Sequence, residues 1–458
     1  MTLIKSISGF RGTIGGKPGE NLTPVDAVNF ASAYGTWLIE NNKSKKVIVG
    51  RDARISGEMI SNIVCSTLLA LGIDVVDLGL STTPTVEIAV PKEKAGGGII
   101  LTASHNPAQW NALKLLNDKG EFVSGEDGKR ILSIVDQSAY DFADVFELGK
   151  LTTDDSYIKK HIEDILKLPL VDVEAIRKSK FKVAVDAVNS TGGISVIPLL
   201  KALGVTDIKE LYCEPTGYFP HNPEPLPEHL TELADVMKSG YEVGITVDPD
   251  VDRLAFVCED GSMFGEEYTL VAVADYVLGK TPGATVSNMS SSRALKDVTE
   301  QHGQSYFASE VGEVNVVRTM KEQNAVIGGE GNGGIIYPEL HYGRDSLVGI
   351  ALFLSHLAHT KKTLTELKAG YPAYHISKNK IELTPEIDVD AVLEAMKKKF
   401  SNETIDDRDG VKIEFATEWV HLRKSNTEPI IRIYAESKDE KAANELALKT
   451  IEDIKSVI

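Results

Sequence analysis

Hydrophobic residues in the first 150 positions follow two alternating patterns. After a Thr23-Pro24 pair, which favours a helix start, apolar residues recur at helical spacing from Ala27 to Leu38. The runs "KVIVG", "DVVDLGL" and "GGGIILT" are instead short and apolar, as strands are, and a helix-period segment separates the first two. This βαβ alternation is typical of α/β proteins.

Three segments far apart in the chain repeat one arrangement of strand, small-residue loop and helix start. They read "VIVGRDARISG", "VAVDAVNSTGG" and "TVSNMSSSRAL". Identity between them is low, but the order of elements is the same. We therefore expect three related α/β modules.

The pattern changes from about Tyr371. We expect a helix over Val389 to Lys399, short strands at "VKIEFA", "EWVHLR" and "IIRIYAE", and a charged amphipathic helix at the end of the chain. This fourth module has the order of an α+β domain.

Two earlier stretches are expected to be irregular: the acidic residues 143–156, and the proline-rich residues 217–230, which form an ordered loop crossing the second module.

These patterns predict an α/β protein of four domains. The chain has 458 residues, which exceeds the roughly 250 to 300 residues of a single core. We expect three related mixed α/β modules at residues 1–151, 152–255 and 256–370, followed by an α+β domain at residues 371–458.

Charge and cysteine content narrow the class of function. The 49 basic and 67 acidic residues give a net charge of −18, which argues against nucleic-acid or anionic-membrane partners. A bound anion would need a local basic pocket. The three cysteines are widely spaced and suggest neither a disulfide framework nor a zinc site, so we expect a cytoplasmic protein. The most apolar helix candidate, Ser346 to Ala358, is shorter than the roughly 18 residues of a membrane span.

The stretch "TASHNP" follows an expected buried strand and contains Ser104. In doubly wound sheets, loops at the carboxyl ends of strands line the binding crevice. A lone serine in such a loop often only caps a helix. Here His105 is a candidate donor to an oxyanion, Asn106 and Pro107 favour a tight turn, and Lys114 follows in an expected return strand. A presented hydroxyl beside cations suits phosphoryl chemistry.

The stretch "DPDVDR" places Asp248, Asp250 and Asp252 at alternate positions directly after the strand-like "VGITV", and Arg253 follows them. A solvated acidic turn is one explanation. Three carboxylates so close together would repel one another, however, and alternate oxygen ligands on a loop suit one hard cation. We therefore expect a Mg²⁺ site here.

Two further loops have the composition of binding sites. In "GGEGNGG", Glu330 and Asn332 lie among five glycines, which allow close approach to a ligand, and the two side chains supply the acceptor and donor that sugar hydroxyls need. The alternative is a bare flexible turn. In "RKSNTEPIIR", two cations, Arg423 and Lys424, and two hydroxyls lie in one loop between strands, which suits a phosphate dianion, although a solvated basic turn has the same composition.

Together these four loops resemble the α-D-phosphohexomutases, the group of phosphoglucomutase, phosphomannomutase and phosphoglucosamine mutase. The resemblance runs in order along the whole chain, and "SGFRGT", "GRDARISG" and "TASHNP" add specific matches to it. It implies four domains around a central cleft and a soluble enzyme, monomeric or homodimeric, that acts on a hexose or hexosamine phosphate.

The resemblance also implies roles for individual residues. Ser104 would be the phosphoserine and a ligand of Mg²⁺, which Asp248, Asp250 and Asp252 would also hold. His105, Lys114 and Arg11 would act at the catalytic centre, with Lys114 as general acid or base if its surroundings lower its pKa. The residues expected to bind substrate are Arg253, Glu330, Asn332, Arg423, Ser425, Asn426, Thr427 and Arg432.

The mechanism implied is an exchange of phosphoryl groups between Ser104 and the two ends of the sugar, through a bound 1,6-bisphosphate that turns over in the cleft. The sugar loop, "GEGNGG", matches neither bacterial form of the motif, "GEMSGH" or "GEQSGH", and is closer to the "GEENGG" of archaeal-type members. Ala112 replaces a glycine of the family pattern after the serine loop, and Lys424 and Asn426 replace a proline and a glycine of the phosphate loop. We favour glucosamine phosphate as the substrate, with mannose or glucose phosphate as alternatives.

Two other classes of function fit parts of the chain. A metal-dependent phosphatase would use Asp248 as nucleophile, but that hypothesis leaves "TASHNP" and residues 423–432 unexplained. A non-catalytic sugar-phosphate sensor would have lost part of the serine or metal loop, and both are intact.

Overall fold

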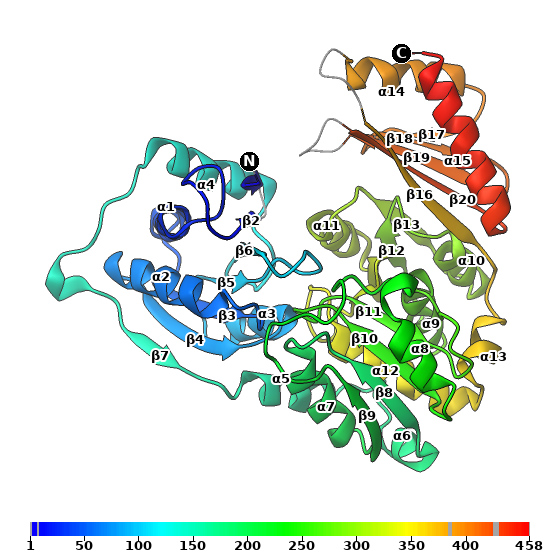
Figure 1. Ribbon diagram of the computed structural model, residues 1–458, viewed down its shortest axis with the longest axis horizontal. Helices are drawn as coiled ribbons and strands as arrows, with labels where there is room; N and C mark the ends of the chain where they lie inside the picture. The colour runs from blue at the N-terminus through cyan, green and yellow to red at the C-terminus, as the bar shows by residue number, and fades with distance from the viewer. Residues whose placement is uncertain (1, 7–8, 383–386, 425–429, 458) are drawn as a thin grey trace.

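The computed structural model of the chain places its strands in four separate sheets (Figure 1), and it describes residues 2–6, 9–382, 387–424 and 430–457. The predicted fold class is confirmed: three mixed α/β domains are followed by a smaller α+β domain. None of the described helices combines the length and the hydropathy that crossing a membrane would require.

The first sheet has seven strands in the order β1-β2-β6-β5-β3-β4-β7. Their bounds are Ile4–Ser6 (β1), Gly9–Thr13 (β2), Lys46–Arg51 (β3), Asp74–Leu80 (β4), Gly97–Leu101 (β5), Trp110–Leu116 (β6) and Leu151–Thr153 (β7). The helices of this domain are Pro24–Glu40 (α1), Gly57–Ala70 (α2), Thr83–Lys92 (α3) and Gly125–Gln137 (α4).

The second sheet runs β11-β10-β8-β9, and the third runs β13-β12-β14-β15. Their strands are Lys182–Asp186 (β8), Asp207–Leu211 (β9), Val243–Val247 (β10), Leu254–Val257 (β11), Thr285–Asn288 (β12), Tyr306–Ser309 (β13), Ile327–Glu330 (β14) and Gly334–Ile336 (β15). The helices around them are Tyr157–Ile165 (α5), Val173–Ser179 (α6), Gly192–Ala202 (α7), Thr231–Met237 (α8), Glu266–Leu278 (α9), Ala294–Gln301 (α10), Glu313–Gln323 (α11), Ser346–Thr360 (α12) and Leu364–Lys368 (α13).

The three sheets share one topology, which confirms the predicted repeat. In each, the first strand of the unit is central (β3, β8, β12), the second pairs parallel to one side of it (β4, β9, β13), and the third pairs parallel to the other side (β5, β10, β14). A fourth strand then returns antiparallel to the third (β6, β11, β15). The turn from the third strand to the fourth is therefore the same structural position in all three domains.

The fourth domain is an antiparallel sheet in the order β16-β20-β19-β18-β17, with two helices. Its elements are His375–Glu382 (β16), Val389–Lys399 (α14), Thr404–Asp406 (β17), Val411–Glu414 (β18), Trp419–Lys424 (β19), Ile430–Ser437 (β20) and Glu440–Lys455 (α15). The predicted helix over Val389 to Lys399 has the observed bounds of α14. Figure 1 shows this domain apart from the first one, with its open side toward the space between them.

The irregular stretches differ in part from the prediction. Residues 143–156 contain a short helical turn at Val145–Glu147 and also β7, because this segment pairs with the exposed edge of β4. The proline-rich loop contains one short turn, Pro227–His229, and is otherwise irregular as expected. The domain limits predicted after residues 151 and 255 fall inside β7 and β11, so limits a few residues later would keep each strand with its sheet.

Local sequence explains where the first helix begins. Thr23 is the N-cap of α1, its hydroxyl accepts from the Asp26 backbone N–H, and the Asp26 carboxylate accepts from the Thr23 N–H. This reciprocal capping arrangement satisfies two backbone donors that the first turn would leave unpaired. Pro24 at the first helical position has no N–H to satisfy, so it fits the same start.

The first sheet is covered on both faces. Val47 and Val49 of β3 pack with α1, α2 and α4, whereas Ile48 between them packs with α3 on the opposite face. This alternation follows from the two-residue period of a strand. A strand buried on both sides reads as a continuous apolar run, which is why "KVIVG" shows no polar alternation.

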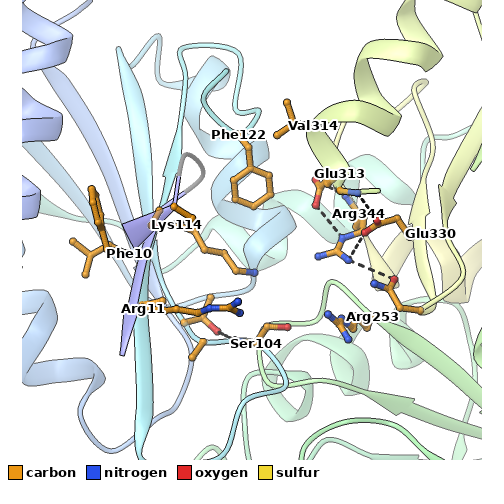
Figure 2. Close-up of a pocket in the computed structure, with 18 of the residues that line it drawn as sticks. Phe10, Arg11, Ser104, Lys114, Phe122, Arg253, Glu313, Val314, Glu330 and Arg344 are labelled. Atoms are coloured by element: carbon orange, nitrogen blue, oxygen red, sulfur yellow. Dashed lines mark hydrogen bonds and ion pairs between the residues drawn. The ribbon is translucent and has the colours of Figure 1, made fainter. Parts of the chain in front are cut away.

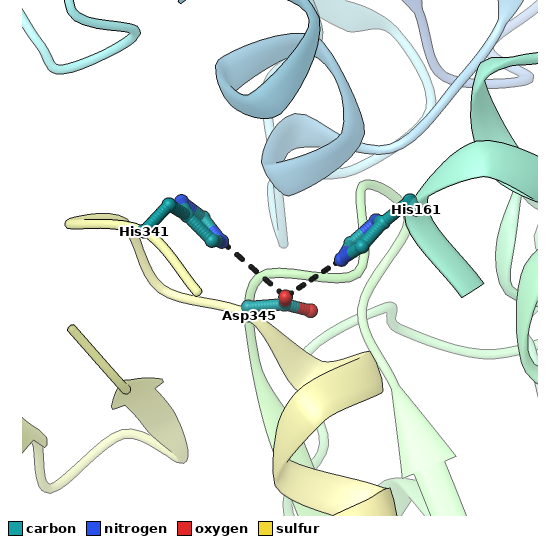
Figure 3. A group of neighbouring side chains, drawn as sticks. All are labelled: His161, His341 and Asp345. Carbon is teal, nitrogen blue, oxygen red and sulfur yellow. Dashed lines mark hydrogen bonds and ion pairs between the residues drawn. The ribbon is translucent and has the colours of Figure 1, made fainter. Parts of the chain in front are cut away.

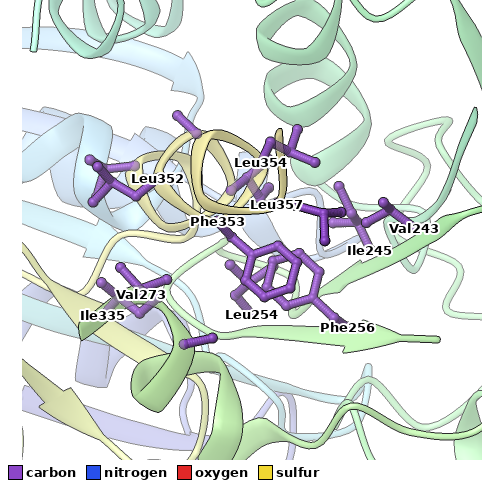
Figure 4. Packing of buried hydrophobic residues seen from close by; sticks show 14 of the residues in the cluster. Val243, Ile245, Leu254, Phe256, Val273, Ile335, Leu352, Phe353, Leu354 and Leu357 are labelled. Atoms are coloured by element: carbon purple, nitrogen blue, oxygen red, sulfur yellow. The ribbon is translucent and has the colours of Figure 1, made fainter. Parts of the chain in front are cut away.

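One hydrophobic core joins the second and third domains. Helix α12 is apolar around its whole circumference, and it packs into a cluster that also contains Ile245, Leu254 and Phe256 of the second sheet. The Phe353 ring stacks on Phe256 with centroids 3.8 Å apart (Figure 4). The first and fourth domains have cores of their own. The second and third domains therefore form one packed unit.

Replacing Phe353 with alanine should destabilise this unit. The side chain is fully buried, so the substitution removes its packing and leaves a cavity, with an expected cost of about 3 to 5 kcal/mol. Urea unfolding followed by circular dichroism measures the change. The matched control is Phe146→Ala, because Phe146 is 98% exposed and its removal should leave the midpoint where it is. Equal midpoints for the two variants would contradict the shared core.

Candidate active site

The three equivalent turns meet at one cavity of about 470 Å³. Figure 2 shows Phe10, Arg11 and Lys114 on one wall, and Glu313, Glu330 and Arg344 on the wall that faces it, with Ser104 and Arg253 between them. The lining residues are Ser6, Gly9, Phe10, Arg11, Thr102, Ala103, Ser104, Ala112, Leu113, Lys114, Phe122, Arg253, Val311, Gly312, Glu313, Val314, Asn315, Glu330, Asn332 and Arg344. The cavity is thus built by the first three domains.

Ser104 lies in the turn between β5 and β6, not at the start of a helix. Its backbone has φ of 49°, in the left-handed region that non-glycine residues rarely occupy. The Ser104 hydroxyl donates to Asp248 Oδ2 at 2.6 Å, across the boundary between two domains. The structure therefore does not support the capping interpretation, and it places this hydroxyl beside the aspartate cluster.

A buried arginine holds the serine loop in shape. The Arg54 guanidinium donates to the backbone carbonyls of Ser104, Asn106, Pro107 and Trp110. The carboxylate of Asp52 pairs with Arg54 Nε at 3.0 Å. A carbonyl-lined arginine of this kind fixes several backbone positions at once, which explains how the strained conformation of the loop persists.

The three aspartates of "DPDVDR" converge as predicted. They are fully buried in the turn between β10 and β11, and one carboxylate oxygen of each lies within 4.8 Å of the others. Asp250 Oδ1 and Asp252 Oδ1 are buried without a hydrogen-bond partner among the described residues. Unpaired buried carboxylate oxygens are costly, and a hard cation with oxygen ligands would satisfy them, so the site fits Mg²⁺.

The pKa values of the aspartates reflect this crowding. Burial, followed by the charges of Asp250 and Asp252, raises the pKa of Asp248 well above its usual value. Burial would also raise the pKa of Asp252, but Arg344 and Lys114 outweigh it and hold that pKa below its usual range. The negative charge of the three carboxylates therefore exceeds the positive charge of the basic side chains bonded to them.

Lys114 is on the predicted return strand, β6, but its electrostatics differ from the expectation. Its ammonium donates to Asp250 Oδ2 at 2.6 Å and to Asp252 Oδ2 at 3.2 Å. Burial favours a lower pKa for Lys114, yet the charges of Asp250 and Asp252 prevail and raise it above its usual value. The lowered pKa that a role as general acid or base would require is not found in the structure, because the charges of Asp250 and Asp252 raise the pKa.

Arg344, which the sequence patterns did not single out, connects the metal and sugar loops. Its three nitrogen groups donate to Asp252 Oδ2 at 2.7 Å, Glu313 Oε2 at 2.9 Å and Glu330 Oε2 at 2.8 Å. Burial raises the pKa of Glu313 to about 7, although Arg344 opposes the rise. The one local signal for Arg344 is its place beside Asp345, directly before an apolar helix.

Glu330 and Asn332 lie in the turn between β14 and β15 and both line the cavity. Glu330 Oε1 accepts from Asn288 Nδ2 at 2.8 Å and from the Gly312 N–H at 3.2 Å. Asn332 Oδ1 has weaker contacts, to the Gly334 N–H at 3.3 Å and to Arg344 at 3.4 Å. Glu330 is therefore fixed in place, whereas Asn332 retains bonding capacity for a ligand.

Arg11 and Arg253 line the cavity, and a third arginine, Arg432, lies near enough to act on Arg11. Partial desolvation, with the positive charges of Arg432 and Arg253, lowers the pKa of Arg11. Among the residues that the structure describes, Arg253 Nε is buried without a hydrogen-bond partner, and its guanidinium approaches Glu224 only to 3.9 Å. Burial, followed by the charge of Arg253, lowers the pKa of His105 to about 2, so this imidazole is neutral. Repelling cations around a cleft favour an anionic ligand.

The phosphate loop is described only at its ends. Arg423 Nε forms an ion pair with Asp409 Oδ2 at 2.9 Å, and Lys424 Nζ pairs with Asp390 at 3.0 Å on the surface. Neither Arg423 nor Arg432 lines the cavity, although Arg432 is near enough to act on Arg11. Ser425, Asn426 and Thr427 lie outside the described residues.

Comparisons with known proteins agree with the fold. Residues 3–141, 157–261 and 265–374 match phosphoglucomutase/phosphomannomutase α/β/α domains I, II and III, and residues 380–452 match the C-terminal domain of the same proteins. A phosphoglucomutase/phosphomannomutase of Thermococcus kodakarensis is 36% identical over 453 residues, covering 96% of this chain and 98% of the relative.

A phosphoglucosamine/phosphogalactosamine mutase of Sulfurisphaera tokodaii is 32% identical over 472 residues, covering 100% of this chain and 99% of the relative. The crystal structure of a phosphoglucomutase/phosphomannomutase family protein from Burkholderia thailandensis superposes with a TM-score of 0.85 over 99% of this chain and 97% of that one. Its 24% identity supports the fold. With four matching domains in order and curated relatives along the whole length, the chain belongs to the phosphoglucomutase/phosphomannomutase family of phosphohexomutases and is an enzyme of the mutase type.

Proposed function

We propose that this enzyme interconverts the 1-phosphate and 6-phosphate of a hexose through a phosphoserine at Ser104. The observation that carries the proposal is the hydrogen bond of 2.6 Å from the Ser104 hydroxyl to Asp248, within a carboxylate cluster that has two unpaired oxygens. A hydroxyl at a cation site, on the floor of a cleft with arginines, suits reversible phosphorylation.

The reaction needs two transfers at one centre. In the first, the bond from phosphorus to Ser104 Oγ breaks while a bond forms to the free hydroxyl oxygen of the sugar, and the hydroxyl proton ends on Ser104 Oγ. The product in the cleft is a 1,6-bisphosphate. After the sugar turns over, Ser104 Oγ loses its proton to the departing sugar oxygen and takes the other phosphoryl group, which leaves the isomer.

Asp248, Asp250 and Asp252 would hold Mg²⁺ together with the phosphate on Ser104. When bound, the ion supplies positive charge that stabilises the transferring phosphoryl group and offsets the crowding of the three carboxylates. Arg11 and Arg253 supply donors in the cavity. His105 does not line the cavity, but its Nδ1 lies 3.5 Å from Ser104 Oγ, and the neutral imidazole can donate one N–H.

Lys114 is the candidate for relaying the proton between the sugar oxygen and Ser104 Oγ. In the structure its ammonium is bound to Asp250 and Asp252, so it begins as an acid. We propose that it passes its proton to Ser104 Oγ as the phosphoryl group leaves and regains one from the attacking sugar hydroxyl. Lys114 and Ser104 line the same cavity, which supports this proposal.

The loop over residues 423–432 is proposed to bind the phosphate that is not reacting. Arg432 lies close enough to Arg11 to lower its pKa, so the fourth domain contributes positive charge to the cleft. Because the sugar binds in two orientations, this loop and the sugar loop must serve both ends of the molecule. Asn426 and Thr427 are assigned here on the family pattern alone.

Glucosamine phosphate is the proposed substrate. Glu313, Glu330 and Asn332 form one wall of the cavity, and a hexosamine ammonium would be better accommodated by these acceptors than a hydroxyl would. The names of the two relatives indicate different substrates: one is named for glucose and mannose phosphates and the other for amino-sugar phosphates. A phosphatase would instead release inorganic phosphate from hexose 1-phosphate, and a sensor would do neither, so product analysis separates the three functions.

Ser104→Ala should abolish turnover while leaving the fold intact. The substitution removes the oxygen that carries the phosphoryl group, so the rate should fall at least about a hundredfold, or about 2.7 kcal/mol. A coupled mutase assay measures it, and intact-protein mass spectrometry should show a phosphate-sized adduct on the wild type alone. The control is Ser239→Ala, which removes an exposed hydroxyl remote from the cleft. A Ser104→Ala enzyme within tenfold of the wild type would refute the phosphoserine.

Asp250→Asn should weaken Mg²⁺ binding at least about tenfold, or about 1.4 kcal/mol, because a neutral amide replaces one charged ligand. Isothermal titration calorimetry gives the affinity, and activity should recover in part at high Mg²⁺. Asp235→Asn is the control, since the side chain of Asp235 is 75% exposed on the second domain. Unchanged affinity in Asp250→Asn would mean that "DPDVDR" does not hold the ion.

Variants of the sugar loop should separate general binding from specificity. Glu330→Gln should lower kcat/KM for glucosamine, glucose and mannose phosphates together, because the amide loses the charge that holds Arg344 and the sugar hydroxyls. Asn332→Ser should change the ranking of the three sugars, since it withdraws a group that both donates and accepts. Equal losses on all three substrates in Asn332→Ser would locate specificity elsewhere in the cleft.

A further inference from the structure

A second cluster of metal-ligand side chains lies outside the cavity, where the first three domains meet. It consists of His161 on α5, His341 on the loop before α12, and Asp345 at the N-cap of α12. Figure 3 shows both imidazoles directed at the Asp345 carboxylate from opposite sides. The phosphohexomutase mechanism proposed above uses none of these three side chains.

The distances between the candidate ligand atoms suit a small metal ion with tetrahedral coordination. His161 Nε2 lies 2.9 Å and His341 Nε2 lies 3.3 Å from the same oxygen, Asp345 Oδ2. Bonds of ~2.0 Å in a tetrahedral zinc site would separate neighbouring ligand atoms by ~3.3 Å. The other oxygen, Asp345 Oδ1, accepts from the Leu347 and Val348 N–H groups and so fixes the carboxylate in position.

The outer nitrogen of His161 has a hydrogen-bond partner that would orient this ring as a ligand, and the outer nitrogen of His341 faces a carboxyl group. His161 Nδ1 is 2.9 Å from the Thr85 hydroxyl, and His341 Nδ1 is 3.5 Å from Glu87 Oε2. A histidine that binds metal through one nitrogen usually donates its other N–H to such a group. His161 can therefore keep its proton on Nδ1 and leave Nε2 free to bind an ion, while His341 Nδ1 lies near Glu87 without a hydrogen bond among the described residues.

Charge balance also favours a cation. Asp345 and Glu87 are both buried, and neither Glu87 oxygen has a hydrogen-bond partner among the described residues. The nearby Arg344 is already bonded to Asp252, Glu313 and Glu330. A cation among these side chains would compensate the charge of the buried Asp345 carboxylate, whose burial away from water is otherwise unfavourable.

A similar group elsewhere in the chain lacks this geometry. His302 and His356 also approach one carboxylate, that of Asp275, but they face different oxygens, at 2.7 Å and 3.5 Å. Tyr371 donates to the second of those oxygens at 3.0 Å. That group has the contacts of an ordinary hydrogen-bond network and is a matched comparison.

We propose that His161, His341 and Asp345 form a second metal site that binds a divalent transition-metal ion of the zinc type. Two imidazoles and one carboxylate with one open position are a ligand set for such ions, whereas the all-oxygen aspartate cluster suits Mg²⁺. The ligands come from the second and third domains, and Thr85 and Glu87 of the first domain support them. A bound ion would thus link the second and third domains directly, and it would link the first domain through Thr85 and Glu87.

Metal content of the purified enzyme tests this proposal. After incubation with Zn²⁺ and dialysis against excess Mg²⁺, the wild type should retain one zinc per chain. His341→Gln should retain none, and it is expected to fold because the His341 side chain is 12% exposed. His302→Gln and Asp250→Asn should both retain the zinc. A wild type without zinc, or a His341→Gln enzyme that keeps it, would overturn the site and leave both histidines as hydrogen-bond donors to Asp345.

A second variant identifies the ligand directly. With Co²⁺ in place of Zn²⁺, His341→Cys should bind the ion and show a thiolate-to-cobalt charge-transfer band that the wild type lacks. Such a band arises only if residue 341 coordinates the metal. Its absence, in a His341→Cys protein with native circular dichroism, would refute His341 as a ligand.

Discussion

Buried negative charge at the meeting point of three domains is the constraint around which the cleft is organised. Asp248, Asp250, Asp252, Glu313 and Glu330 are all buried there, and the bonded cations they share are Lys114 and Arg344. Such a group is stable only when each carboxylate has donors of fixed geometry. The bonds of Lys114 and Arg344 therefore tie β6 of the first domain, the metal turn of the second and the sugar turn of the third to one another.

This arrangement explains which parts of the site were predictable. Ser104 and the three aspartates belong to short strings whose chemistry is complete within a few residues, so the sequence was sufficient to identify them. Arg54 donates to carbonyls 50 to 56 positions away, and one partner of Arg344 is 92 positions away, so the roles of both arginines depend on contacts that a local pattern does not show. The pKa of Lys114 depends likewise on carboxylates 136 and 138 positions away.

The elements of the fold likewise divide into those that local sequence predicts and those that depend on distant contacts. The three modules were predictable because strand, loop and helix recur at similar spacing, and local capping and apolar runs specify each element. Strand β7 was missed because its residues are exposed and acquire their conformation from the edge of β4. Sequence patterns also did not predict the common core of the second and third domains, because the contact of Phe353 with Phe256 joins two modules that are separate in the sequence.

The three turns occupy equivalent positions, which is the arrangement expected after gene duplication. A serine, three aspartates and a glutamate occupy the same structural position in successive copies of one unit, which is the arrangement that duplication and fusion of an ancestral gene would produce. Each copy could then diverge in its turn while its sheet stayed under separate selection for packing. With the roles proposed above, a change of substrate in such a lineage would fall in the third copy, and the first two copies would keep the residues proposed for phosphoryl transfer.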